Sequence, residues 1–227
     1  MGIIDPFIGS SPVRVAETIA RLYAGGELFL HIGVTLYETV LGFVLGTAAG
    51  TLIAIMLWWS PAINRVLDPY LVVLNALPKI ALGPILIVWF GAGITSIIVM
   101  ALLISFVVTI MSVLAGFNEI TGEKQLLMKT LGASKLQIFT MVVLPASLPT
   151  IMNALKISVG MSWVGVIVGE YLVSKAGLGY LIVYGGQVFK LDLVMASIVV
   201  LCLLAALMYY GVAYMEKKLV KWRMHGG

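Results

Sequence analysis

The chain has 227 residues, of which 61% are hydrophobic and 11% charged, whereas a soluble domain has roughly 45–50% apolar and about 25% charged residues. This composition excludes an ordinary soluble fold and predicts an all-α integral membrane protein, because a backbone in lipid must satisfy its polar groups within helices. The net charge of +4 does not indicate nucleic-acid binding, since the Lys and Arg residues lie at the ends of apolar segments and act as topology signals.

Residues 1–31 are expected to form an external segment before the first membrane span. The segment has neither a charged start nor a long apolar core, so it does not read as a signal peptide. From Pro12 onward, Val15, Ile19 and Leu22 share one face opposite polar residues, which predicts a short amphipathic helix. This helix lies either on the membrane surface or against the protein.

Five apolar segments are predicted to be membrane-spanning helices within a domain of residues 32–223. Each holds about 20 largely apolar residues, enough to cross a bilayer as a helix. Their expected bounds are Val34–Trp59, Pro69–Phe90, Ile94–Phe117, Ile151–Tyr171 and Leu193–Met215. In the first span Gly42, Gly46 and Gly50 recur every four residues, so one face is smooth enough for another helix of this chain or of a second copy.

The second span contains Pro78 and Pro84 and carries Asn75 and Lys79. Because proline removes a helical hydrogen bond, we expect this helix to bend or open near its middle. A charged residue beside such a break is a functional candidate, since burial in lipid is costly without a partner or water. The alternative is that the Lys79 side chain reaches the membrane interface.

The fourth span carries Lys156 near its start, Glu170 near its end and Trp163 between them. The two charges are about 21 Å apart along the helix axis and cannot pair directly, so each is expected near a membrane interface. The glycine-rich residues 174–190 are expected to form a loop.

Residues 118–149 form the longest polar interruption of the chain, and their pattern predicts a helical hairpin. Gly132 is suited to end one helix, because glycine adopts the left-handed conformation without strain. Ser134 and Gln137 form a capping box that starts the next helix, which is expected to stop at Pro145 and Pro149. Such an element is suited to binding by a soluble partner, although a plain loop is the alternative.

The Lys and Arg residues give an orientation for five spans. One side of the membrane collects Arg65, Lys124, Lys129, Lys135, Lys217, Lys218, Lys221 and Arg223, and the other collects Arg14, Arg21, Lys175 and Lys190. The positive-inside rule therefore predicts that the hairpin and the C-terminus lie in the cytoplasm, with the N-terminus outside.

No catalytic or metal-binding constellation is found in the sequence. It contains no P-loop motif, and the glycines around Leu178 lack the third glycine and the preceding strand of a dinucleotide site. His31 and His225 are predicted on opposite sides of the membrane and cannot share a metal ion within one subunit. Cys202 lies in an apolar segment as a small filler. Transport or channel activity therefore fits better than enzymatic activity.

The hairpin resembles the EAA loop of permease subunits of bacterial ABC importers. When the glycine of that motif is aligned on Gly132, its final positions fall on Val142, Leu144 and Pro145, which match in character or identity. The E-A-A positions fall on residues 126–128, which do not match.

Four further stretches extend the resemblance over most of residues 35–223. NALPKIALGPILIVWFGAG, KTLGASKLQIFTMVVLPASLP, LKISVGMSWVGVIVGEYL and AGLGYLI are similar to the nitrate, sulfonate, taurine and bicarbonate branch of these permeases. The resemblance implies a type I ABC importer permease bundle. Members commonly have six spans, so the family's first span is expected to be absent here, in a short natural form or a trimmed chain.

The resemblance also implies partners and a location. Two permease copies, identical or closely paralogous, would pair in the bacterial inner membrane lipid, with two cytoplasmic ABC ATPase subunits and an external solute-binding protein. ATP and Mg would be bound by the ATPase, with no cofactor in this chain. The implied ATPase-coupling residues are Leu126, Leu127, Met128, Thr130, Leu131, Gly132, Ala133, Ser134, Lys135 and Gln137. The implied mechanism is alternating access, in which rigid helix bundles rock around a central path. The candidates for lining this path are Asn75, Lys79, Lys156, Trp163 and Glu170.

Two other functions stay open. A channel or ion-coupled secondary transporter would need no ATPase, but it predicts an inverted internal repeat and a charge relay within the membrane. A membrane scaffold would use the hairpin to recruit a soluble partner without moving a solute. The identity of the solute lies outside the sequence, although Lys79 suits a small anion.

Overall fold

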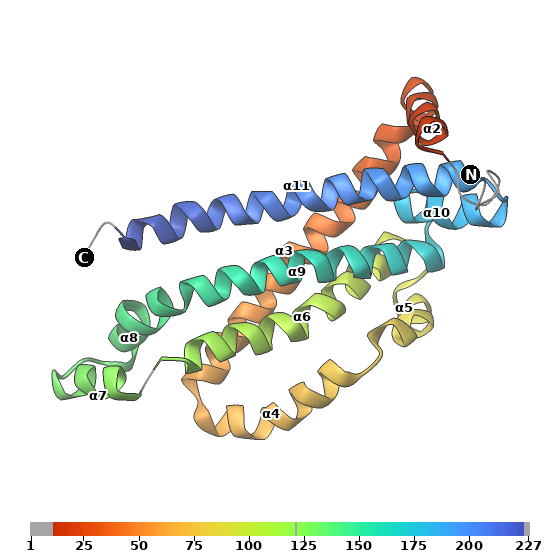
Figure 1. Cartoon of the computed structure of the whole chain (residues 1–227). Coiled ribbons are helices and arrows are strands. Elements are labelled where there is room, and N and C mark those ends of the chain that lie inside the picture. The colour runs from red at the N-terminus through yellow and green to blue at the C-terminus, as the bar shows by residue number, and fades with distance from the viewer. Residues whose placement is uncertain (1–10, 121, 225–227) are drawn as a thin grey trace, which may run out of the picture. The chain divides into compact units, whose positions relative to one another are not determined.

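The computed structural model describes residues 11–120 and 122–224, and every regular element in them is helical (Figure 1). This confirms the all-α prediction. The elements in chain order are α2 (Pro12–Ala24), α3 (Glu27–Trp59), α4 (Pro61–Ala76), η1 (Lys79–Leu82), α5 (Gly83–Phe90), α6 (Ile94–Asn118), α7 (Gly122–Thr130), α8 (Lys135–Ile138), η2 (Phe139–Val143), α9 (Leu144–Val173), α10 (Leu178–Gln187) and α11 (Leu191–Met224).

Within the described residues, four helical segments are long and apolar enough to cross a membrane. They are α3, α6, the segment Lys135–Val173 that ends with α9, and α11. A fifth span results if α4 and the helical residues Lys79–Phe90, which a short break separates, are counted together. The described residues therefore hold four spans, or the predicted five if this bent pair is one span. The helix is interrupted at Pro78, where the break was predicted.

The chain divides into two compact units. Unit 1 comprises Met1–Val44, Pro78–Ile104 and Met161–Met208, and unit 2 comprises Leu45–Leu77, Ser105–Gly160 and Tyr209–Gly227. The helices α3, α6, α9 and α11 each contribute one part to each unit.

In unit 1, small residues bring α3 and α9 against the same point of α6. A Cβ atom on Gly42 would lie 2.7 Å from the Cβ of Ala101, and one on Gly165 would lie 2.5 Å from the Cα of Ala101. No side chain fits into spaces this narrow, so close backbone approach holds the helices together. Ala101, Ile97 and Val166 form the buried cluster at this crossing. The Gly42 position therefore packs within the subunit.

The N-terminal amphipathic helix is present as α2. Its start is capped by Ser11, whose side chain accepts a hydrogen bond from the backbone of Arg14 (3.3 Å). Arg14 also forms an ion pair with Asp192 of α11 (2.8 Å). Val15 and Ile19 face an apolar hollow that α11 also lines, so the helix packs against the protein. Residues 1–10 of the predicted external segment, and His225, lie outside the described residues.

The core of unit 2 is aromatic and tightly packed. Phe139 lies with its ring centroid 5.0 Å from that of Trp58 and 5.5 Å from that of Phe117, and Phe117 is fully buried. Gly50 packs directly against Thr109 of α6, where an added Cβ would be 2.8 Å from the threonine Cβ.

The prediction that the hairpin helix stops at Pro145 and Pro149 is wrong. Both prolines belong to α9, which begins at Leu144 directly after the π-helical turn η2. Pro145 is in the first turn, where no N–H is required. The interior Pro149 removes one helical hydrogen bond, that to the Pro145 carbonyl, and α9 continues past it. Nearby, the Ser147 hydroxyl lies 2.7 Å from the Val143 carbonyl and 2.9 Å from the Gly116 carbonyl of α6.

The predicted loop at residues 174–190 is also wrong, because most of it is the helix α10. Glycine weakens a helix of this length on its own. The first turn of α10 is instead held by side chains of α3 and α9, which belong to the site described below.

Candidate functional site

The polar hairpin of unit 2 consists of α7, a glycine turn and α8. Gly132 has a positive φ of 79°, and the N–H groups of Gly132 and Ala133 bond to the carbonyls of Lys129 and Met128, both at 3.0 Å. These bonds satisfy the carbonyls that the end of α7 leaves open. The predicted helix stop at Gly132 is confirmed.

The capping box at the start of α8 is also confirmed. The backbone N–H of Gln137 donates to Oγ of Ser134 (3.3 Å), and the N–H of Ser134 donates to Oε1 of Gln137 (2.7 Å). Both ends of the turn are therefore closed by local hydrogen bonds, and the hairpin is a defined element rather than a plain loop.

Lys135 ties the hairpin to the end of α3. Its ammonium group donates to the carbonyl of Trp59 and lies 5.5 Å and 5.6 Å from the ring centroids of Trp58 and Trp59, within the range of a cation–π interaction. The same tryptophans pack on Phe139. One lysine and an aromatic cluster thus connect the hairpin to the end of α3.

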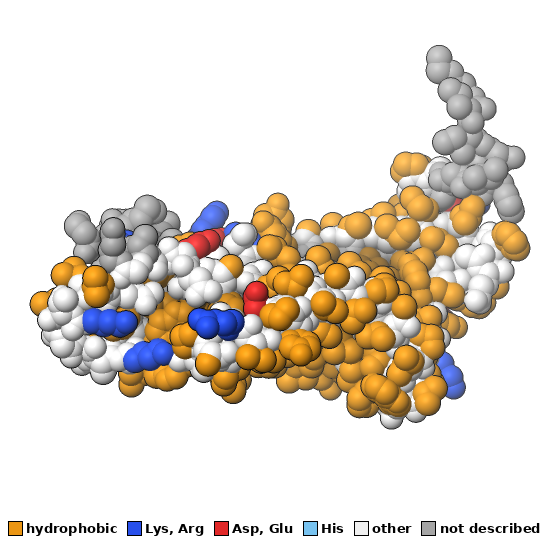
Figure 2. Space-filling view, turned by 90° about the horizontal axis from the view of Figure 1, so that it is seen from below, with side chains coloured by type: hydrophobic (Ala, Val, Ile, Leu, Met, Phe, Trp, Pro, Cys, Tyr) orange, Lys and Arg blue, Asp and Glu red, His pale blue; other side chains and the backbone are white. Residues whose placement is uncertain are grey.

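The predicted coupling residues all lie in this hairpin, but they face two ways. Met128 and Ala133 pack against the buried core of unit 2. Leu126, Leu127 and Leu131 are exposed, Leu131 by 74%. Thr130 donates its hydroxyl to the Leu127 carbonyl (2.7 Å). The hairpin therefore offers an apolar outer surface, while Met128 and Ala133 pack on the core of unit 2. On the face shown in Figure 2, hydrophobic side chains cover much of the surface and Lys and Arg side chains are few.

The residues predicted to line a path occupy different settings. Asn75 is in the last turn of α4 and exposed, and Lys79 is half-buried at the start of η1. Lys156 forms an ion pair with Glu216 of α11 (2.8 Å). Trp163 is 3% exposed, and among the described residues its indole N–H has no hydrogen-bond partner.

Glu170 lies in unit 1, is 1% exposed, and accepts hydrogen bonds at both carboxylate oxygens. Oε1 accepts from the hydroxyl of Thr35 (2.6 Å). Oε2 accepts from the backbone N–H groups of Gly179 (2.5 Å) and Tyr180 (3.3 Å). Glu170 is therefore buried within unit 1 and bonded to α3 and α10, and as predicted it does not pair with Lys156.

Two further bonds complete a cap on α10 built by other helices. The hydroxyl oxygen of Thr35 accepts from the N–H of Leu178 (2.7 Å), and Nδ1 of His31 accepts from the N–H of Gly177 (2.9 Å). The N–H groups at a helix start have no partner within the helix, and a carboxylate there is favoured by the helix dipole. In Figure 1, α10 lies beside the C-terminal end of α9.

The glycines of the Gly177-Leu178-Gly179 turn are required by this cap. Gly177 has a φ of 114°, and a Cβ on it would lie 2.4 Å from the Glu170 carboxylate. A Cβ on Gly179 would lie 2.8 Å from Oε2 of the same group. Sequence reasoning missed His31, Thr35 and both glycines as members of this cluster. The available signal was that α3, which is otherwise apolar, carries His31 and Thr35. Their side chains can accept hydrogen bonds from the free N–H groups at a helix start.

Glu38, one turn after Thr35 in unit 1, is the second buried carboxylate of the region. It is fully buried, and its carboxylate lies beside that of Glu170. In the described residues no group of three or more His, Cys, Asp or Glu side chains could hold a metal ion. The cluster is therefore best understood as a helix cap within the apolar bundle.

Together, the apolar helices, the broken second span and the polar hairpin define a multi-pass membrane protein. The chain belongs to the family of binding-protein-dependent transport system inner membrane components, whose model matches residues 42–221. It is similar to the permease SsuC of Bacillus subtilis, named for aliphatic sulfonates transport, with 31% identity over 98% of this chain and 81% of that protein.

Two other comparisons agree. The taurine transport system permease protein TauC of Escherichia coli is 28% identical over 99% of this chain and 82% of its own length. The fold is that of a type I ABC importer permease: a structure of the MetNI methionine ABC transporter in an inward-facing conformation matches with a TM-score of 0.72 at 20% identity, covering 83% of this chain and 94% of that one.

Proposed function

We propose that this chain is the permease subunit of an ATP-driven importer, coupled to a separate ATPase through residues 118–149. The observation that carries the proposal is the hairpin: a turn closed by Gly132 and the Ser134–Gln137 box, anchored on α3 by Lys135, with an exposed leucine surface. Exposed apolar side chains on a rigid polar element are typical of a protein-binding surface. A flexible loop would deform when the ATPase moves, whereas a hairpin closed by hydrogen bonds and anchored on α3 would move together with α3.

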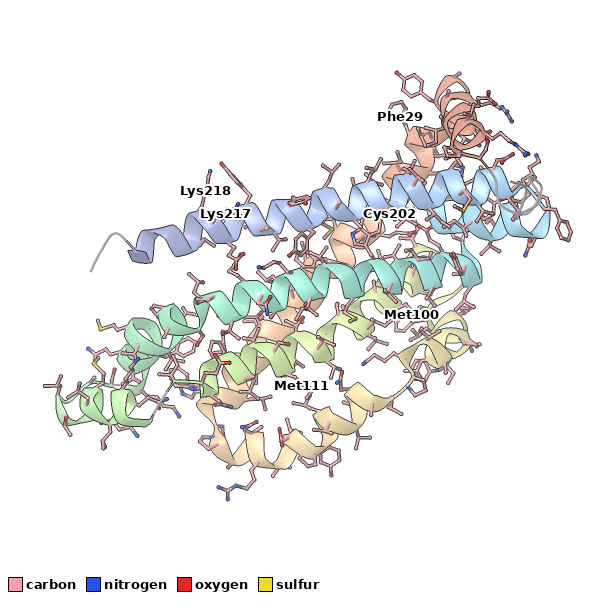
Figure 3. The ribbon with its side chains drawn as sticks, viewed as in Figure 1. Phe29, Met100, Met111, Cys202, Lys217 and Lys218 are labelled. Atoms are coloured by element: carbon pink, nitrogen blue, oxygen red, sulfur yellow. The ribbon has the colours of Figure 1, made fainter. Side chains whose placement is uncertain are left out.

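The proposed assembly follows from the family. Two permease copies pair in the bacterial inner membrane, each bound to one cytoplasmic ATPase subunit that holds ATP and Mg, and an external binding protein delivers the solute. The basic residues near the hairpin and on α11, among them Lys217 and Lys218 (Figure 3), support a cytoplasmic hairpin and C-terminus by the positive-inside rule. The permease itself carries out no catalysis in this scheme.

The proposed solute is a small anion of the sulfonate class. The relatives named for sulfonate and taurine transport support this class, and Lys79 supplies a positive charge beside the broken span. In the proposed path, Asn75 and Lys79 contact the solute. Lys156, Trp163 and Glu170, all on α9, are the other residues proposed to line the path.

Co-purification and uptake test the coupling proposal. A tagged permease should bring down an ABC ATPase subunit, and Gly132→Pro should abolish ATP-dependent uptake because proline cannot adopt a positive φ. Gly122→Ala is the matched control, since Gly122 begins α7 and an added Cβ meets nothing within 4 Å. Uptake that persists without any ATPase subunit would instead favour an ion-coupled transporter.

Charge reversal tests the anion proposal. Lys79→Glu should abolish uptake of the sulfonate and its stimulation of ATP hydrolysis, whereas the exposed Lys175→Glu should leave both unchanged. Normal uptake by the Lys79→Glu variant would remove Lys79 from the path.

A further inference from the structure

Unit 2 contains a polar cavity of about 390 Å³ on the inner side of the hairpin. It lies where α3 ends and α4 begins, and its walls come from α3, α4, α6, α7 and α8. Its polar lining consists of Asn64, Asn118, Gln125, Lys129 and Lys135, and Trp58 forms an aromatic wall. A volume of this size accommodates a small organic group, and the two lysines favour an anionic one.

The cavity has an unmet hydrogen-bonding requirement as well as its positive charge. Oδ1 of Asn64 is buried, and among the described residues it has no donor. An amide oxygen buried without a donor is costly. A ligand that combines an anionic group for the lysines with a hydroxyl for Asn64 would satisfy both features.

The location of the cavity points to a lipid as the source of that ligand. Trp58 and Trp59 end the apolar segment of α3, and tryptophan is enriched where membrane helices meet water. On either side of Asn64, α4 exposes the apolar side chains of Ile63 and Val66, which suit acyl chains. A polar pocket and an apolar surface thus lie next to each other. This arrangement matches the polar headgroup and the apolar acyl chains of a phospholipid.

The face of α7 that lines the cavity differs from the face that is exposed. Gln125 and Lys129 are four residues apart and share one side of the helix, and both line the cavity. Leu127 is two positions after Gln125 and is 62% exposed, so it points about 200° away around the helix. The leucine surface assigned to the ATPase therefore does not cover the cavity.

We propose that this cavity binds the headgroup of an anionic phospholipid. The phosphate group is held by Lys129 and Lys135, and a headgroup hydroxyl donates to Oδ1 of Asn64. Bound lipid would pack between the hairpin and the ends of α3 and α4 and would support the position of the hairpin.

Native mass spectrometry of the purified full chain, with equal amounts of phosphatidylglycerol and phosphatidylcholine, tests the proposal. Lys129→Gln should reduce retained phosphatidylglycerol about fivefold, the effect of one basic residue at an anionic lipid surface, and should not change phosphatidylcholine. Asn64→Leu should reduce it further by removing the hydroxyl acceptor. Lys124→Gln is the matched control, because Lys124 is a lysine of the same helix that does not line the cavity.

Three results would overturn the proposal. Equal phosphatidylglycerol on the Lys129→Gln and Lys124→Gln variants would show that the cavity does not hold the lipid. Displacement of the lipid by millimolar inorganic phosphate would identify a soluble anion as the ligand. Lipid that is present on the isolated permease and lost from the complex with its ATPase would show that an acidic side chain of the ATPase occupies the cavity. Retention in both forms supports the lipid site, whether or not the coupling proposal holds.

Discussion

Replacing Glu170 by Leu should release the first turn of α10 from α3 and α9. The carboxylate accepts hydrogen bonds from Thr35, Gly179 and Tyr180, and a leucine side chain of similar volume accepts none. The substitution keeps roughly the same packing volume and removes the cap, together with a carboxylate that is buried beside Glu38.

The cost follows from the donors that would lose their acceptor. The Thr35 hydroxyl and the Gly179 N–H are buried, and leaving a buried donor unsatisfied costs about 1–3 kcal/mol each. The half-buried Tyr180 N–H can reach water and is not counted. The expected loss is therefore at least about 2 kcal/mol. Glu170→Gln keeps one acceptor oxygen and should lose about half as much.

Hydrogen exchange and thermal melting of the purified permease would measure this loss. The amides of residues 178–180 should exchange much faster in Glu170→Leu, and the melting temperature should fall by about 4–8 °C for a chain of this size. Glu119→Gln is the matched control, because Glu119 also accepts from a threonine hydroxyl, that of Thr150 (3.1 Å), but at an exposed site. Unchanged protection of these amides in Glu170→Leu would refute the cap.

Three further substitutions test other parts of the structure by thermal melting. Ser134→Ala removes the acceptor of the capping box and should cost about 1 kcal/mol, with faster proteolysis of the hairpin; wild-type resistance would contradict a structural role for the box. Lys156→Glu and Glu216→Lys should each destabilise the protein by placing like charges together, and the double exchange should recover most of the loss; a double variant no better than either single one would argue against the ion pair. Gly50→Val should cost about 1–3 kcal/mol by overpacking the α3–α6 contact, whereas Gly211→Val, where an added Cβ meets nothing within 4 Å, should be neutral; equal melting temperatures would contradict this packing.

The hairpin was predictable because its determinants are local. Gly132 is needed for a positive φ, and Ser134 and Gln137 bond to each other across three residues. The same holds for α2, whose start at Ser11 and Pro12 depends on a cap within one turn. Patterns of this kind are complete within a short window of sequence, so no knowledge of the packing is required.

The continuation of α9 through two prolines was not predictable from such a window. Proline is a reliable stop signal when the freed carbonyls have no other donor. In unit 2, α9 instead packs closely on α6 on both sides of Pro149: the Ser147 hydroxyl lies 2.9 Å from the Gly116 carbonyl, and a Cβ on Gly116 would lie 2.9 Å from the Cβ of Thr150. The outcome depends on a neighbouring helix that lies 31 residues away in sequence.

The helix α10 was even less predictable from a short window of sequence, because distant residues hold its start. Its first turn is capped by Thr35 and His31, which lie 143 and 146 positions away from their partners, so the local pattern of glycines indicated only a loop. A buried polar residue in an apolar span is costly without a partner. The sequence alone therefore indicates that His31 and Thr35 each have a hydrogen-bonding partner in the fold. Interpreting them as caps would have placed a helix start beside α3, and Glu170 supplies the negative charge that such a start favours.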